Sequence, residues 1–134
     1  MAETLELRVA TPERELVNEQ VSEVQLPGRS GYMGILPGHA ALVGRLGTGT
    51  LTYVASGRKR CLAVHGGFVE VAEDHVRVLA DAAESQEDID LARAKRAYQR
   101  SLEESVNPAL GVDPAVALAA LARAQARIDA VENK

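Results

Sequence analysis

The sequence has little aromatic character, because it lacks tryptophan and contains three tyrosines and one phenylalanine in 134 residues. It has a single cysteine, Cys61, which excludes a disulfide within the chain and predicts a reducing compartment. No apolar run approaches the about 20 residues that span a bilayer, and the N-terminus has no signal-peptide pattern. These absences predict a soluble, cytosolic protein that contacts a membrane only through another protein.

An excess of basic charge is also missing, since 15 basic residues stand against 19 acidic ones and the net charge is −4. This balance argues against nucleic acid as a partner. Hydrophobic residues make up 46% of the chain, which predicts an aliphatic core and argues against wholesale disorder. The length fits one domain, or one domain with a small appendage.

No pattern for catalysis or metal binding can be identified. His39, His65 and His75 have no i, i+4 spacing and no cysteine pair accompanies them, which favours ordinary polar or turn positions. There is no recognisable Ser–His–Asp or paired-carboxylate arrangement. Cys61 lies in an apolar segment and is expected to pack in a core. We therefore expect no catalytic residues and no metal site.

Glycine is confined almost entirely to the first two-thirds of the chain, because only Gly111 follows Gly67. Short runs with the apolar alternation of strands precede Glu84, and turn pairs separate the later ones at Ser56-Gly57, Gly66-Gly67 and Glu73-Asp74. The predicted strands are 5–9, 22–26, 50–54, 61–64, 68–71 and 75–79. This spacing predicts a β-sandwich or barrel over residues 1–84.

Residues 85–134 have the apolar periodicity of helices instead. Ser85 and Asp88 fit a capping box for a first helix, and Asn107-Pro108 ends that helix. Asp113-Pro114 starts a second helix, so an antiparallel hairpin is expected. The apolar stripes are Leu91, Ala94, Tyr98 and Leu102, then Ala117, Leu121, Ala124, Ile128 and Val131. Because an alanine-lined seam buries little apolar area, the hairpin is expected to detach more readily than the sandwich unfolds.

The stretch from Gly28 to Ala40 is the densest motif of the first part. Its glycines favour tight turns with positive φ. It is not a phosphate-binding loop, since no GKS/T sequence and no helical pattern follow it. Two interpretations stay open, namely structural turns and a docking surface for another protein.

The helical part carries basic residues at regular spacing. One helix face holds Asp90, Arg93, Ala97 and Arg100, and the second helix has Arg123 and Arg127 one turn apart. A solvated face is one interpretation. A folded hairpin could instead bring four arginines together around a polyphosphate through forked hydrogen bonds. A detached first helix could lay its basic face on an acidic partner.

Five motifs follow one another as LPG (26–28), GILPGHA (34–40), GGFVEV (66–71), VLAD (78–81) and IDLARA (89–94). In this order they resemble the epsilon subunit of the bacterial F-type ATP synthase over essentially the whole chain. The resemblance implies an N-terminal β-sandwich of about ten strands and a C-terminal helical hairpin. It implies a non-catalytic rotor subunit of the central stalk, peripheral to the cytoplasmic face of the bacterial cell membrane.

The resemblance also implies partners and a regulatory mechanism. The sandwich would bind the gamma subunit and the ring of c subunits, and the hairpin would alternate between a compact and an extended form. The extended form would insert between the alpha and beta subunits and inhibit ATP hydrolysis. The basic residues that could make this contact are Arg93, Lys95, Arg96 and Arg100.

Some family members bind ATP in the compact hairpin as a regulator, although no cofactor is required. By resemblance, this site would comprise Glu84, Ile89, Asp90, Arg93, Ala94, Arg100, Arg123 and Arg127. The residues that would meet the c ring or gamma are Arg29, Ser30, Tyr32, Met33 and His39, with core packing as the alternative for Tyr32 and Met33. The alternative function is a stand-alone nucleotide-binding sensor that changes shape without a complex.

Overall fold

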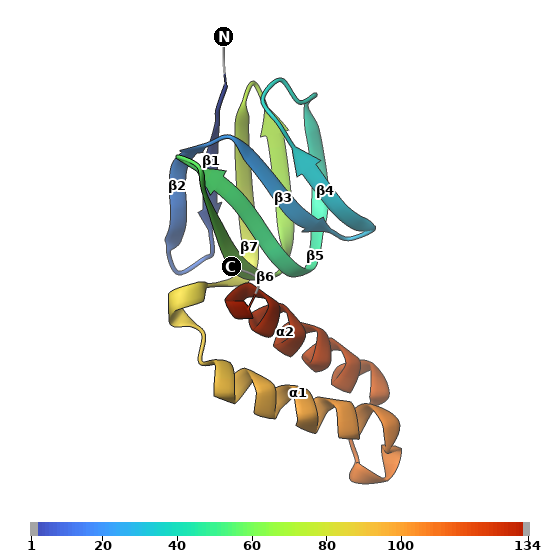
Figure 1. Ribbon diagram of the computed structural model, residues 1–134. Helices are drawn as coiled ribbons and strands as arrows, with labels where there is room; N and C mark the ends of the chain where they lie inside the picture. The colour runs from blue at the N-terminus through green and yellow to red at the C-terminus, as the bar shows by residue number, and fades with distance from the viewer. Residues whose placement is uncertain (1–2, 133–134) are drawn as a thin grey trace.

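The computed structural model describes residues 3–132, which form a β-rich body followed by a helical hairpin (Figure 1). The strands are β1 (Leu5–Ala10), β2 (Glu15–Val21), β3 (Glu23–Gly28), β4 (Gly31–Ile35), β5 (Leu42–Ala55), β6 (Arg58–Ala72) and β7 (His75–Ser85). The helical elements are η1 (Gln86–Asp88), α1 (Leu91–Val106), η2 (Pro108–Leu110) and α2 (Pro114–Glu132).

The strands form one sheet in the order β2-β1-β7-β6-β5-β3-β4, in which only β1 and β7 are parallel neighbours. The sheet curls until its edge strand β2 reaches β5, where the Tyr53 hydroxyl donates a hydrogen bond of 2.9 Å to Glu19. The enclosed side chains are almost all leucine, valine and isoleucine. This β-sandwich followed by a helical hairpin confirms the predicted fold class.

The expectation of about ten strands differs from the seven found in the described residues. In three long strands the pairing is interrupted once, at Gly47 in β5, Gly66 in β6 and Asp81 in β7. Dividing each at its interruption adds three segments to the seven strands and gives ten. Gly66-Gly67 is thus a break inside β6 and not the predicted turn. Gly67 has a φ of 120°, and a Cβ there would collide with the Leu79 carbonyl oxygen.

Strand β6 is buried on both faces from Cys61 to His65, and this stretch determines where the hairpin docks. Leu62 and Val64 belong to the sandwich core. His65 lies on the opposite face by strand alternation and is only 7% exposed. That face packs on α2 through a small cluster, formed by Cys61, Ala63, Ala126 and Ala130. Figure 1 shows the consequence: α2 lies against the sandwich, and α1 lies on the far side of α2.

The predicted capping box at Ser85 is wrong. Ser85 is still paired with Leu62 in the sheet and precedes only the short η1, and its side chain makes no capping hydrogen bond. The chain instead turns through η1, and Asp90 caps α1 by accepting a hydrogen bond of 3.0 Å from the Arg93 backbone N–H.

The other helix boundaries agree with the prediction. Helix α1 ends at Val106, before Asn107-Pro108. Helix α2 begins at Pro114, and the Asp113 carboxylate accepts a hydrogen bond of 2.8 Å from the Ala115 N–H. The predicted stripes supply the buried residues Ala94, Ala117 and Ala124, whereas Leu102 is 37% exposed. Ser101, Ala126 and Ala130 are also buried but were not predicted.

Candidate anion-binding site

A cleft of about 350 Å³ lies where the two helices meet the end of β7. Its uncharged lining is small, formed by Ala94, Ala97, Ser101 and Ala120. Its charged lining consists of Glu84, Asp88, Asp90, Arg93, Arg100, Arg123 and Arg127. Four arginines against three carboxylates leave a formal excess of one positive charge. The cleft therefore has the charge and the volume to accept a multiply charged anion.

The carboxylates of the cleft are engaged, whereas most of its guanidinium groups are not. Asp88 pairs with Arg14 at 2.9 Å, and Asp90 is used as a helix cap. The guanidinium groups of the other three cleft arginines make no ion pair or side-chain hydrogen bond within residues 3–132, and these are Arg93, Arg100 and Arg123. Forked donors without partners favour a bound polyphosphate or carboxylate.

Glu84 connects the hairpin to the sandwich at the wall of this cleft. Both of its carboxylate oxygens lie 2.9 Å from Arg127 Nε of α2, and one lies 2.8 Å from His65 Nε2 of β6. Burial alone would raise the pKa of Glu84, but the hydrogen bonds and charges of His65 and Arg127 outweigh it and the pKa is lowered. Glu84 is therefore a carboxylate at neutral pH.

The structure brings together seven of the eight residues predicted for a nucleotide site, since all of them except Ile89 line the cleft. Ile89 packs instead against the apolar cluster of Cys61 and α2. Asp88, Ser101 and Ala120 also line the cleft but were not predicted, whereas Ala97 lies on the predicted face of Arg93 and Arg100. Ala97 and Ala120 follow from the helical period, whereas the buried Ser101 does not stand out from an apolar stripe.

The predicted basic face of α1 is divided by the structure. Arg93 and Arg100 line the cleft. Lys95 and Arg96 are exposed and lie outside it, and Lys95 pairs with Glu132 of α2 at 3.3 Å. Arg93 and Arg100 can therefore contact an anion inside the hairpin, while Lys95 and Arg96 can contact a partner outside it.

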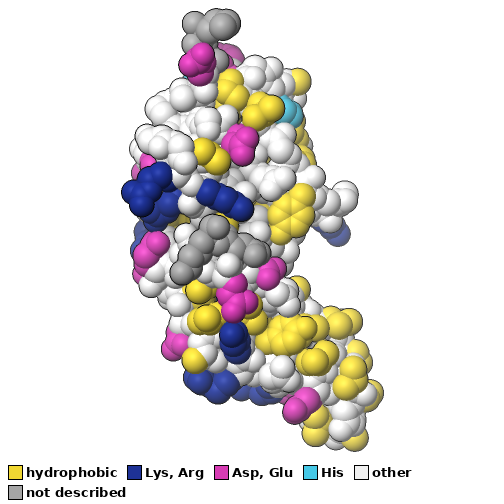
Figure 2. Space-filling model, in the orientation of Figure 1, with side chains coloured by type: hydrophobic (Ala, Val, Ile, Leu, Met, Phe, Trp, Pro, Cys, Tyr) yellow, Lys and Arg dark blue, Asp and Glu magenta, His cyan; other side chains and the backbone are white. Residues whose placement is uncertain are grey.

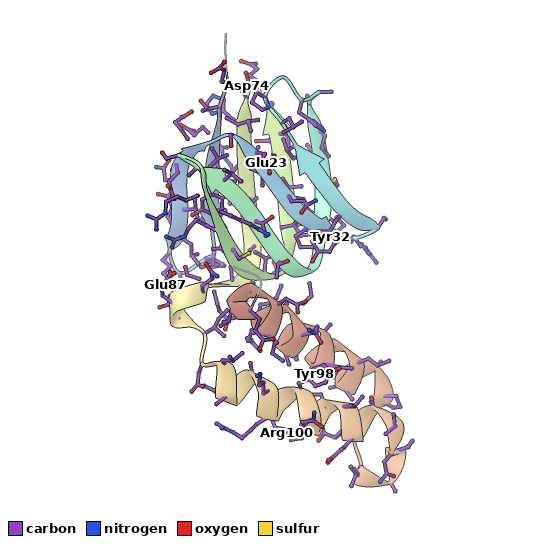
Figure 3. The ribbon with its side chains drawn as sticks, in the orientation of Figure 1. Glu23, Tyr32, Asp74, Glu87, Tyr98 and Arg100 are labelled. Atoms are coloured by element: carbon purple, nitrogen blue, oxygen red, sulfur yellow. The ribbon has the colours of Figure 1, made fainter. Side chains whose placement is uncertain are left out.

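The residues predicted to meet the c ring or gamma lie at both ends of β4. Four of them adjoin a hollow of about 520 Å³ at the β3–β4 turn, and these are Arg29, Ser30, Tyr32 and Met33. His39 follows the other end of β4, in the turn where the Gly38 N–H donates to Asp74. Figure 3 shows Asp74 and Tyr32 far apart on the sandwich. His39 is thus not part of the same surface.

Tyr32 and Met33 differ in exposure. Tyr32 is 58% exposed, although its hydroxyl accepts a hydrogen bond of 3.0 Å from the Thr50 N–H. Met33 is half-buried and packs on the sandwich core. The surface interpretation therefore suits Tyr32, and the alternative of core packing suits Met33.

Two exposed apolar surfaces were not found from the sequence. The first, here called the sandwich patch, spans β5 to β7 and consists of Val43, Phe68 and Leu79, which are 74%, 49% and 55% exposed. Arg45 lies over the Phe68 ring at 5.5 Å from its centroid. The second, the hairpin tip, consists of Val106, Leu110, Val116 and Leu118. Figure 2 shows apolar side chains gathered at that end of the hairpin.

Within residues 3–132, no cluster of three or more histidine, cysteine or acidic side chains could hold a metal ion. No helix in the same range is long and apolar enough to cross a membrane. The fold and the cleft define this chain as a β-sandwich protein whose C-terminal helical hairpin encloses an arginine-lined cleft.

Comparison with known proteins shows which family this chain resembles. The family described as ATP synthase, Delta/Epsilon chain, beta-sandwich domain matches residues 4–86, and the corresponding long alpha-helix domain matches residues 87–132. The ATP synthase epsilon chain of Solibacter usitatus is 65% identical over 100% of both chains. That of Desulfitobacterium hafniense (strain Y51) is 43% identical over 99% of this chain and 100% of its own.

The chain therefore belongs to the ATP synthase delta/epsilon family, as an epsilon chain, which confirms the predicted resemblance. Such a chain is a non-catalytic component of its enzyme complex, in agreement with the prediction.

Two solved structures share the fold. A chain of the Euglena gracilis mitochondrial ATP synthase, in an assembly of OSCP, F1 and c-ring, matches with a TM-score of 0.78 at 24% identity, over 99% of this chain and 82% of its own. A chain of the Tetrahymena thermophila mitochondrial ATP synthase central stalk and c-ring matches with a TM-score of 0.53 at 17% identity. The second match covers 62% of this chain and 67% of the other.

Acidification is expected to weaken the docking of the hairpin. In the docked form the pKa of Glu84 is lowered, and it returns toward 4.5 when Arg127 leaves. Such a carboxyl favours docking above its ordinary pKa, and the contribution disappears as the pH falls through the lowered value. Hydrogen exchange of residues 124–130, corrected for intrinsic rates, should therefore show protection that decreases as the pH falls below the ordinary pKa of a glutamate.

Glu84→Gln is the control for this pH dependence. It should lower protection already at neutral pH and remove the further decrease on acidification, because the titrating group is gone. A decrease of the same size in both proteins would show that another group is responsible.

Proposed function

We propose that the chain is a rotor subunit in the central stalk of a proton-translocating ATP synthase. It couples rotation of the c ring to ATP synthesis at the cytoplasmic face of the bacterial cell membrane. The observation that carries this proposal is the identity of 65% to an ATP synthase epsilon chain over the full length of both chains. Its sandwich would bind the gamma subunit and the c ring, and it would reach the membrane only through them.

The sandwich patch supports a docking role. Three large apolar side chains from three different strands share one shallow hollow on the outer face of the sheet. Exposed clusters of this kind mark protein interfaces, and a charged pair, Glu70 with Arg77, lies at its border at 3.7 Å. We propose that this patch faces gamma, with the β3–β4 turn around Tyr32 facing the c ring.

Phe68→Asp is expected to weaken binding of the chain to an ATP synthase complex that lacks its epsilon chain. Burying a new charge and losing an aromatic anchor should cost about 2 kcal/mol or more, which is about 30-fold in affinity. Binding can be measured by surface plasmon resonance with an immobilised complex. Leu110→Asp, at the hairpin tip, is the matched control and should bind normally. Loss of binding in the control alone would assign docking to the hairpin.

The cleft supports a regulatory role for ATP. The arginines without partners would hold the phosphates between α1 and α2, so that bound ATP favours the compact hairpin. A ligand shifts such an equilibrium only through its different affinities for the two forms. When ATP is scarce, the hairpin would extend along gamma toward the alpha and beta subunits and inhibit hydrolysis.

A further inference from the structure

His65 stands at the boundary between the sandwich and the hairpin, with a side chain that is 6% exposed. Its Nε2 is 2.8 Å from Glu84 Oε1, whereas its buried Nδ1 has no hydrogen-bond partner within the described residues. A carboxylate can only accept, so His65 donates from Nε2. Within the described residues, the Nε2–H group therefore makes the one hydrogen bond of this ring.

Glu84 is the only strand residue among those that line the cleft. It is held from two sides, by His65 of the sandwich and by Arg127 of the hairpin. The hairpin also contacts the sandwich through the small Cys61–Ala63–Ala126–Ala130 cluster, through further contact between α2 and β5, and through one hydrogen bond of 2.8 Å from the Gln86 side chain to the Ala130 carbonyl. The side chains of the cluster are small and bury little area, so the charged contact contributes substantially to holding the hairpin.

We propose that His65 is a positioning residue that ties the cleft to the sandwich. Its N–H fixes the Glu84 carboxylate, and the carboxylate fixes Arg127, so that this cleft arginine is aligned only while the hairpin is docked. A ligand that uses Arg127 then favours docking, and docking favours the ligand by the same factor. The effect of His65 on docking holds for any ligand, and its extension to ATP rests on the proposed function.

The rate at which iodoacetamide alkylates Cys61 measures docking, because Cys61 is 3% exposed beneath Ala126 and Ala130. His65→Gln keeps an N–H donor at nearly the Nε2 position, His65→Asn is too short to reach Glu84, and His65→Leu removes the donor. Alkylation should be about tenfold faster in His65→Leu and His65→Asn than in the unmodified protein, and within about twofold in His65→Gln.

His75→Leu is the control for loss of a histidine elsewhere. His75 pairs with Glu6 on the exposed side of the sandwich, so this variant should react at the unmodified rate. Far-UV circular dichroism shows whether each variant keeps the sandwich. An unchanged rate in His65→Leu, or equal rates for His65→Gln and His65→Leu, would overturn the proposal, because a residue that only fills space would not distinguish these two side chains of similar size.

MgATP tests the link to the cleft. It should slow alkylation of Cys61 in the unmodified protein and in His65→Gln, and much less in His65→Leu. Calorimetry shows whether MgATP binds. If it binds but slows the alkylation of Cys61 equally in all variants, the link between His65 and the cleft is wrong. If no variant binds MgATP, the proposed ATP site fails, while the alkylation series without ATP still decides the role of His65 in docking.

Discussion

Replacing Arg93 and Arg127 with alanine is expected to lower the affinity of the isolated chain for MgATP at least about 100-fold. Each guanidinium would contribute charge-assisted hydrogen bonds worth about 1.5–3 kcal/mol, and 1.4 kcal/mol corresponds to tenfold. The two residues stand on different helices, so their loss opens both walls of the cleft. Calorimetric titration of both proteins with MgATP measures the difference.

Lys95→Ala is the matched control, because it removes a positive charge from the same helix but outside the cleft. It should bind MgATP almost as the unmodified protein does. If the unmodified protein does not bind at millimolar MgATP, the arginines are better explained as a docking face for the catalytic subunits. Tight binding by a chain that never associates with other ATP synthase subunits would favour the stand-alone sensor.

Elements with a strong apolar periodicity could be predicted from the sequence. Two strands, β2 and β4, were not predicted, and their position explains why. Strands β2 and β4 are the two edges of the sheet. Glu15–Val21 buries only Val17 and Val21, and Gly31–Ile35 buries only Ile35, so neither presents a full apolar alternation. The break at Gly66-Gly67 was interpreted as a turn because glycine pairs serve both purposes.

Most residues of the cleft could be predicted from the sequence for a different reason. Helical period alone places Arg93 with Arg100, and Arg123 with Arg127, so that only the closing of the hairpin had to be assumed. His65 could not be found in this way, because it meets Glu84 through sheet pairing and Arg127 through tertiary packing. The sandwich patch was missed for the same reason, since its members come from three strands.

Relief of hydrolysis inhibition is expected when the basic residues of α1 are replaced with alanine, in a reconstituted ATP synthase assayed at low ATP. The full variant changes Arg93, Lys95, Arg96 and Arg100. If these side chains meet acidic surface on the beta subunit, losing exposed pairs worth about 0.2–1 kcal/mol each should raise hydrolysis about fivefold. Steady-state ATPase rates measure this, and unchanged inhibition would refute the docking role.

A double variant, Lys95→Ala with Arg96→Ala, separates docking from nucleotide binding, because neither residue lines the cleft. In the compact form Lys95 pairs with Glu132, so its loss should slightly favour the extended, inhibitory form. Weaker docking of α1 on the catalytic subunits would have the opposite effect and raise the rate of hydrolysis. If hydrolysis rises although the compact form is weakened and MgATP still binds, the basic face acts on the catalytic subunits. If hydrolysis falls, Lys95 serves mainly to hold the hairpin closed.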